Sequence, residues 1–240
     1  MSSRIRPTTG YWQQLLDAWP SGAAPKPPYQ FDYPVMLPDG RVLVLPLREL
    51  PEGGRAVASL IANQASFAVV DALAEHMSRL ARAWTADVVV GLPTLGLTFA
   101  PVVAERLGHE RYVPLGYSRK FWYDDALSEP VLSITSPNGQ KRLYLDPNAV
   151  ALLEGKRICL VDDAISTGSS VKSALRLLAR AGLNVAVVVV AMKQTTRWTV
   201  SLEEFGPQLR DAVKAVFGCP MFMWQAEGWV PIEGSMPAIP

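Results

Sequence analysis

One short polar segment between two apolar stretches carries the residue types with the clearest chemistry. It reads Val161-Asp162-Asp163-Ala164-Ile165-Ser166-Thr167-Gly168-Ser169-Ser170. The apolar run 157–161 before it predicts a strand, and the apolar spacing over 171–181 predicts a helix after it. Free N–H groups and the dipole at a helix N-terminus favour a phosphate. The adjacent carboxylates can accept hydrogen bonds from paired hydroxyls, so the segment suits a ribose 5-phosphate.

The elements around this segment predict a parallel sheet. A second apolar run at 185–192 follows the predicted helix, which makes a strand–helix–strand unit with parallel strands. Ligands of such sheets bind beyond the carboxyl ends of the strands, where Asp162 and Asp163 fall. Alone, each polar residue of the segment is better explained as a helix cap or a solvated side chain than as a ligand-binding group. Their order on a βαβ unit is what indicates binding.

The rest of the chain adds further elements to this α/β pattern. A strand is predicted at 88–90 and another at 112–115, with a helix at 98–107 between them. One long helix is predicted over 56–83. Further ranges are irregular or loop-like: a proline-rich region at 1–55 with a hairpin around Pro38-Asp39-Gly40, and a polar stretch at 116–142 with a Ser-Pro-Asn-Gly turn at 136–139. A connection this long predicts a functional lid or a hairpin flap, and 118–142 is the lid candidate.

Composition excludes several classes of protein. The chain has 240 residues, 49% of them hydrophobic, and a net charge of +1 from 23 basic and 22 acidic residues. Balanced charge argues against a nucleic-acid partner, and the longest apolar run, 185–192, is too short to span a bilayer. The N-terminal sequence shows no secretory signal, so a cytoplasmic location is expected. Two cysteines and two histidines predict neither a disulfide scaffold nor a zinc site.

The segment 161–170 resembles the signature of the type I phosphoribosyltransferases. The resemblance implies an α/β, parallel-sheet fold with a hood of terminal segments, dividing the chain into 1–55, a core at 56–196, and 197–240. It implies 5-phosphoribosyl pyrophosphate (PRPP) as the substrate. It also implies that PRPP carries Mg²⁺, with contact between the ion and the carboxylates through water as one option. Asp162 and Asp163 would hold the ribose. The 5-phosphate would lie on Ala164, Ser166, Thr167, Gly168, Ser169 and Ser170.

Two further segments fall where this family binds pyrophosphate. The pyrophosphate loop would be Pro93, Thr94, Leu95 and Gly96. Thr94 and Gly96 match the family best, whereas Leu92, Pro93 and Leu95 replace small or charged residues and put the conformation of this loop in question. After the strand at 112–115 come Arg119 and Lys120, which resemble the family's basic pair. Cations there would stabilise the leaving pyrophosphate.

For the acceptor, the chain is most similar to the xanthine phosphoribosyltransferases, with the adenine enzymes as cousins, over about 56–196. Asn63 lies in a segment similar to the one that supplies an Asn to the purine. Lys193 lies where the 6-oxopurine enzymes carry a lysine for the O6 atom. A cationic donor suits an oxygen and not the amino group of adenine. A purine is therefore expected, with a 6-oxopurine such as xanthine favoured and a terminal aromatic side chain stacked on it.

The resemblance thus predicts an enzyme that transfers the phosphoribosyl group from PRPP to a purine and releases pyrophosphate. Its partners would be PRPP and a nucleobase, and a homodimer is expected. One alternative is a non-purine acceptor. Another is a PRPP-binding regulator without catalysis, although 1–55 shows neither a helix-turn-helix pattern nor a basic cluster of a DNA-binding domain.

Overall fold

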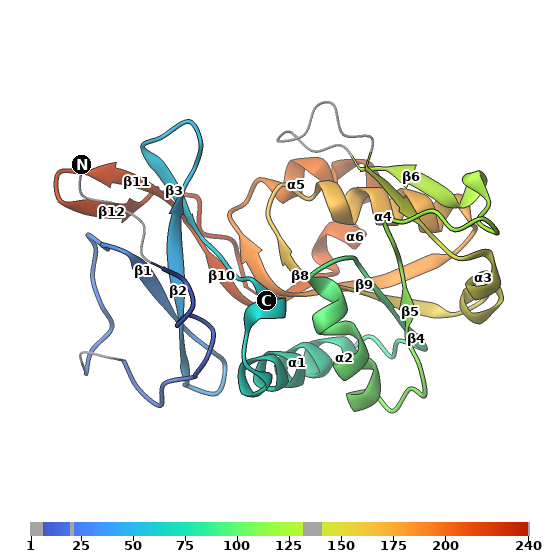
Figure 1. Ribbon diagram of the computed structural model, residues 1–240, viewed down its shortest axis with the longest axis horizontal. Helices are drawn as coiled ribbons and strands as arrows, with labels where there is room; N and C mark the ends of the chain where they lie inside the picture. The colour runs from blue at the N-terminus through green and yellow to red at the C-terminus, as the bar shows by residue number, and fades with distance from the viewer. Residues whose placement is uncertain (1–6, 20–21, 132–140, 240) are drawn as a thin grey trace.

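The computed structural model describes residues 7–19, 22–131 and 141–239. Its larger part contains a parallel sheet of five strands in the order β10-β9-β8-β4-β5 (Figure 1). The strands are β4 Val88–Gly91, β5 Val113–Pro114, β8 Arg157–Ile165, β9 Asn184–Gln194 and β10 Val213–Cys219. The carboxyl ends of all five strands therefore lie along one edge of this sheet.

Helices cover both faces of the parallel sheet. On one face, α1 (Phe67–Arg82) and α2 (Ala100–Arg106) pack on Val89, Val187 and Val189. On the other face, α4 (Ser169–Arg180) packs on alternate residues of the same strands, among them Val88 and Val190. The short α3 (Pro147–Leu153) lies on that second face too. The α/β class and the βαβ unit β8-α4-β9 are confirmed.

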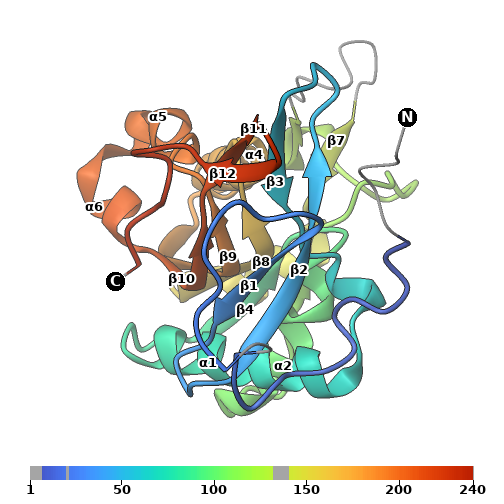
Figure 2. The ribbon, with the colours of Figure 1, turned by 90° about the vertical axis from the view of Figure 1, so that its left-hand side faces the viewer.

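A second sheet forms the predicted hood, and both ends of the chain contribute to it (Figure 2). It is antiparallel in the order β1-β2-β3-β11-β12. Its strands are β1 Asp32–Met36, β2 Val42–Glu49, β3 Arg55–Ala58, β11 Met221–Gln225 and β12 Gly228–Pro231. The predicted hairpin is β1–β2. The two halves of the hood meet where Val57 of β3 pairs with Met221 of β11.

The predicted helix over 56–83 is wrong in its first part. Residues 55–58 form β3, because β2 and β11 offer it backbone partners on both sides and Ala56 and Ala58 are buried. The helix α1 begins only at Phe67, where the Ser66 hydroxyl accepts a hydrogen bond from the Val69 N–H. A single turn of 3-10 helix, η1 (Ala62–Gln64), lies between the two elements.

Strand lengths also differ from the sequence-based expectation. The strand β8 continues through Asp162 and Asp163 to Ile165, so Ala164 belongs to a strand and not to the loop. Lys193 lies within β9 instead of after it. The parallel sheet itself extends beyond residue 196, because β10 pairs with β9. The strand expected at 112–115 is the two-residue β5.

The remaining elements are short. They are η2 Gly96–Thr98, η3 Asp125–Leu127, β6 Ser128–Pro130, β7 Arg142–Tyr144, α5 Trp198–Ser201, η4 Glu203–Phe205 and α6 Gly206–Asp211. The antiparallel pair β6–β7 flanks part of the expected lid. The turn predicted at 136–139 lies outside the described residues. Within the described ranges, no helix is long and apolar enough to cross a membrane, and both cysteines are buried and free.

Candidate active site

Two adjacent carboxylates mark the carboxyl end of β8, near the middle of the parallel sheet. Asp162 is only 6% exposed, and its Oδ1 atom accepts a hydrogen bond of 2.9 Å from the Asp163 N–H. Burial and then the neighbouring Asp163 raise the pKa of Asp162 well above its usual range. Burial also raises the pKa of Asp163 to about 6. No cation of the described residues compensates either carboxyl, so the pair can accept a divalent cation or hydroxyl groups.

The loop of Pro93 to Gly96 lies directly against this pair. A Cβ atom on Gly96 would be 2.7 Å from the Asp162 Oδ1 atom and 2.9 Å from the Val161 carbonyl oxygen, so only glycine fits. The Gly96 N–H donates a hydrogen bond to the Asp162 carboxylate. The peptide bond between Pro93 and Thr94 is cis, and Thr94 is exposed. The structure thus places the expected pyrophosphate loop beside the expected ribose site.

The apolar residues that depart from the family's loop pattern have a packing role. Leu92 is fully buried in the core beneath α4, and its N–H donates to the Val161 carbonyl at 2.9 Å. Leu95 packs against the core on the opposite face of the sheet. Both leucines therefore anchor the loop to the two cores, while Thr94 stays accessible.

The loop after β8 forms a cradle at the N-terminus of α4. Gly168 has a φ of +82°, a left-handed conformation that glycine adopts without strain, and α4 starts at Ser169. The Thr167 and Ser169 hydroxyl oxygens are 3.2 Å apart. Ser166, Thr167, Ser169 and Ser170 are all half-buried and leave hydroxyls at the helix end. The first turn of α4 contains no acidic residue, so nothing there opposes a phosphate.

Tyr117 is a site residue that the sequence analysis did not single out. Its side chain hydrogen-bonds with Ser170, and burial together with the charges of Asp162 and Asp163 raises its pKa. The Lys141 Nζ atom lies 3.6 Å from the centre of the Tyr117 ring. Tyr117 therefore links the carboxylate pair to the phosphate cradle. The signal in the sequence is its place just after β5, at the same edge of the sheet.

Arg119 and Lys120 are not at the carboxylate pair in this structure. Both are exposed, and the Arg119 Nε atom donates to the Asp125 carboxylate at 2.8 Å. The loop next to them carries Phe121, which is 91% exposed and stacks edge-on against Trp122. The cations expected to face pyrophosphate thus lie on an open loop that also holds an ion pair of its own.

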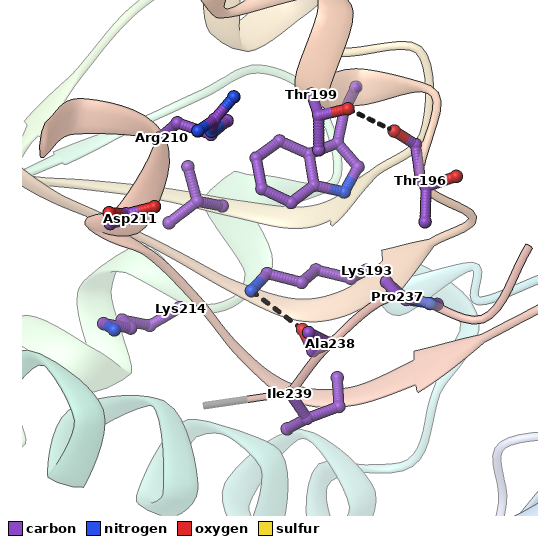
Figure 3. A pocket seen from close by; sticks show the side chains of 11 residues that line it. Lys193, Thr196, Thr199, Arg210, Asp211, Lys214, Pro237, Ala238 and Ile239 are labelled. Atoms are coloured by element: carbon purple, nitrogen blue, oxygen red, sulfur yellow. Dashed lines mark hydrogen bonds between the residues drawn. The ribbon is translucent and has the colours of Figure 1, made fainter. Parts of the chain in front are cut away.

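The two expected base-binding residues lie in different surroundings. Asn63 is exposed on η1. The η1 turn contacts η2, whose first residue is Gly96 of the expected pyrophosphate loop. Lys193 is only 5% exposed, and its Nζ atom donates to the Ala238 carbonyl at 3.2 Å (Figure 3). Burial, and then Lys214, lower the pKa of Lys193 to about 8. The C-terminal tail thus covers Lys193.

This parallel sheet with its hood is the α/β fold predicted for a type I phosphoribosyltransferase. The chain belongs to the phosphoribosyl transferase domain family, whose family model matches residues 56–220. Membership in this family confirms the prediction of a glycosyltransferase-type enzyme. An adenine phosphoribosyltransferase of Novosphingobium aromaticivorans is 32% identical over 154 residues, which cover 61% of this chain and 79% of the relative.

Other relatives have different activities in their names. A transcriptional regulator of Archaeoglobus fulgidus is 36% identical over 109 residues, covering 45% of this chain and 48% of the relative. An orotate phosphoribosyltransferase of Acinetobacter baumannii is 26% identical over 124 residues, covering 51% of this chain and 50% of the relative. Among solved structures, an adenine phosphoribosyltransferase of Thermoanaerobacter pseudethanolicus matches with a TM-score of 0.53 at 22% identity, over 72% of this chain and 95% of that one. The last likeness concerns the fold alone.

Proposed function

We propose that this protein transfers the 5-phosphoribosyl group from PRPP to a nitrogen of a purine base and releases pyrophosphate. The observation that carries the proposal is the meeting of three features at one edge of the parallel sheet. These are the uncompensated pair Asp162 and Asp163, the Gly96 loop in contact with it, and the cradle at the N-terminus of α4. Together they match the ribose, pyrophosphate and 5-phosphate parts of PRPP.

In this proposal the two carboxylates accept hydrogen bonds from the ribose hydroxyls. The 5-phosphate lies on the N–H groups and hydroxyls of residues 166–170, and the pyrophosphate on the backbone of loop 93–96. Displacement at the ribose builds up positive charge on the sugar, which the carboxylates stabilise. The protein's main contribution is then to hold the donor and the base in line.

The carboxylate pair also fits Mg²⁺, which prefers oxygen ligands and keeps several water molecules. No group of three or more His, Cys, Asp or Glu residues is placed to hold a metal ion in the described part of the chain. We therefore propose that PRPP brings the ion and that Asp162 and Asp163 reach it through water. When bound, Mg²⁺ neutralises charge on the departing pyrophosphate.

The loop at 118–142 is proposed to close over the bound substrates and exclude water. In that step Arg119 exchanges Asp125 for pyrophosphate, and Lys120, which has no ion pair among the described residues, joins it. The Arg119 guanidinium group keeps an anionic partner in this exchange, because phosphate oxygens can accept two parallel hydrogen bonds as a carboxylate does.

A purine acceptor is supported by the adenine phosphoribosyltransferase of Novosphingobium aromaticivorans as a relative. It is also supported by the contact between η1, which carries Asn63, and η2, which begins at Gly96. Within the purines, the preference for a 6-oxopurine such as xanthine rests on Lys193 and stays a prediction, while the relative's name favours adenine. A non-purine acceptor has the orotate relative in its favour. The homodimer and the cytoplasmic location also remain predictions.

Pyrophosphate release from PRPP and Mg²⁺, measured with single bases, tests the proposal. The panel is adenine, xanthine, hypoxanthine, guanine, orotate and uracil, and the control is the double variant Asp162→Asn/Asp163→Asn. We expect release with at least one purine and none with the control. Release with orotate or uracil alone would overturn the purine acceptor. PRPP binding without release for any base would instead favour a regulator, in line with the archaeal relative.

A further inference from the structure

A pocket of about 450 Å³ lies beside the edge strand β10. Its walls come from the end of β9, from α5 and α6, and from the C-terminal tail (Figure 3). None of residues 93–96 or 162–170 lines it. The proposed PRPP-binding segments therefore lie outside this pocket, whereas Lys193, the lysine considered for the acceptor base, lines it.

The charged groups around the pocket are mostly cations. Lys193, Arg210 and Lys214 line it, against one carboxylate, Asp211, which is exposed. None of these three cations belongs to an ion pair of the described residues. Burying a cation without a counter-charge is unfavourable. Of the three, Lys193 is buried and the other two are half-buried, so an anion in the pocket would above all supply the counter-charge of Lys193.

Buried hydrogen-bond donors point to the same conclusion. Lys193 carries three N–H donors, and the Ala238 carbonyl at 3.2 Å is its one hydrogen-bond acceptor among the described residues. Trp198, also 5% exposed and part of the pocket wall, has an indole N–H with no acceptor in the described part of the chain. The Lys193 Nζ atom lies 5.3 Å from the Trp198 ring centre. The Lys193 ammonium group thus has N–H donors without an acceptor among the described residues, whereas the Trp198 indole N–H is enclosed by the protein.

Two threonines, Thr196 and Thr199, also line the pocket, and the other wall residues are mostly apolar. The Trp198 ring, Val213, Pro237 and Ile239 form this apolar surface. A flat apolar body would pack against this surface, with its charged end at Lys193 and Lys214. A bare inorganic anion would satisfy the cations but leave these side chains without a partner.

We propose that this pocket binds a small organic anion, with a carboxylate group on Lys193 and Lys214 and a flat apolar body on Trp198. In this assignment Lys193 serves the anion and not the purine. The site is separate from the PRPP site but touches it through α5. Ser201 of that helix donates to the Thr167 carbonyl at 2.5 Å, and the Trp198 Cα atom lies 3.3 Å from where a Cβ on Gly168 would be.

The test uses benzoate as the probe and benzyl alcohol as its neutral counterpart. Binding to the full chain is measured by isothermal titration calorimetry without PRPP, so the result does not depend on whether the chain is active. The variants are Lys193→Met and Lys214→Met, which keep an apolar side chain of similar length. The matched control is Lys156→Met, because Lys156 is an exposed lysine outside the pocket. Circular dichroism verifies that each variant is folded.

We expect benzoate to bind and benzyl alcohol not to. Lys193→Met and Lys214→Met should each weaken benzoate binding at least tenfold, and Lys156→Met should leave it unchanged. Equal affinity in all four proteins, or no binding of benzoate, would overturn the proposal. So would displacement of benzoate by PRPP, since that would place the anion in the PRPP site. A Lys193→Met variant that loses only turnover of 6-oxopurines and keeps its benzoate affinity would return Lys193 to the base.

Discussion

Replacing Gly96 with alanine tests whether the contact between the proposed pyrophosphate loop and the carboxylate pair supports activity. The added Cβ would be 2.7 Å from the Asp162 Oδ1 atom, 2.8 Å from the Asp162 Cα atom and 2.9 Å from the Val161 carbonyl oxygen. Two of these three atoms belong to the backbone of a central strand, which cannot rotate away. The loop must therefore move off β8.

The size of that movement follows from the distances. Ordinary van der Waals contact begins at 3.4 Å, so the closest backbone approach, 2.8 Å to the Asp162 Cα atom, has to open by 0.6 Å. A misplacement of about 1 Å in a reacting group can reduce a rate about 100-fold. We expect kcat/KM for PRPP to fall about 30- to 100-fold. The overpacking should also lower the free energy of unfolding by about 1–3 kcal/mol, which leaves the protein folded at 25 °C.

The assay is initial-rate pyrophosphate release with PRPP as the varied substrate, together with urea unfolding of the same preparations. Gly10→Ala is the matched control, because a Cβ there meets no atom within 4 Å and φ is not in the left-handed region. Its kinetics and stability should equal those of the wild type. If Gly96→Ala retains wild-type kcat/KM while the wild type is active, the contact does not position the pyrophosphate loop and our reasoning fails.

Three further predictions concern the carboxylate pair, the lid and the hood. The protonated form of Asp163 stabilises the fold fully below its ordinary pKa of 3.8, and this contribution is lost as the pH rises through about 6. Asp163→Asn should therefore be more stable than the wild type above pH 6, by at most about 3 kcal/mol. Urea unfolding should show this difference vanish towards pH 4. A difference that stays constant with pH would contradict the raised pKa of Asp163. Arg119→Gln should raise the KM for PRPP and leave the KM for the base unchanged. Asp125→Asn, which frees Arg119 from its ion pair, should not raise the KM for PRPP. Steady-state kinetics with each substrate varied measure both constants, and an unchanged KM for PRPP in Arg119→Gln would remove Arg119 from the site. Trp12 is buried and its indole N–H donates to the Ser59 carbonyl at 3.1 Å, so Trp12→Ala should lower the free energy of unfolding by about 3–5 kcal/mol; a loss under 1 kcal/mol would show that the N-terminal segment does not belong to the folded hood.

The sequence pattern predicted those parts of the fold that local spacing determines. The strand, acidic pair, small-residue loop and helix from 157 to 181 follow each other without interruption, so their pattern indicates the βαβ unit and the loop proposed to hold the phosphate. The Gly91 to Gly96 loop was located correctly for the same reason. In each case strand, loop and helix are neighbours in the chain.

The features that sequence reasoning missed depend on residues far apart in the chain. The strand β3 exists because β2 and β11 flank it, and alanine-rich sequence alone favours a helix there. Tyr117 becomes a neighbour of Asp162 only when the ends of β5 and β8 meet at one sheet edge. Lys193 is covered by a tail 45 residues later in the sequence. Local periodicity contains none of these contacts.

The pairing of β3 with β11 also constrains the order of folding. Residues 57 and 221 can meet only after the intervening chain has compacted, since closing so long a loop is entropically unfavourable until other contacts hold its ends together. The β1–β2 hairpin can form locally, but its sheet stays incomplete during synthesis until β11 has emerged from the ribosome. Until then β3 has an unpaired edge, which is open to strands of other molecules. Chaperone dependence should therefore be greatest for nascent chains that end before residue 221.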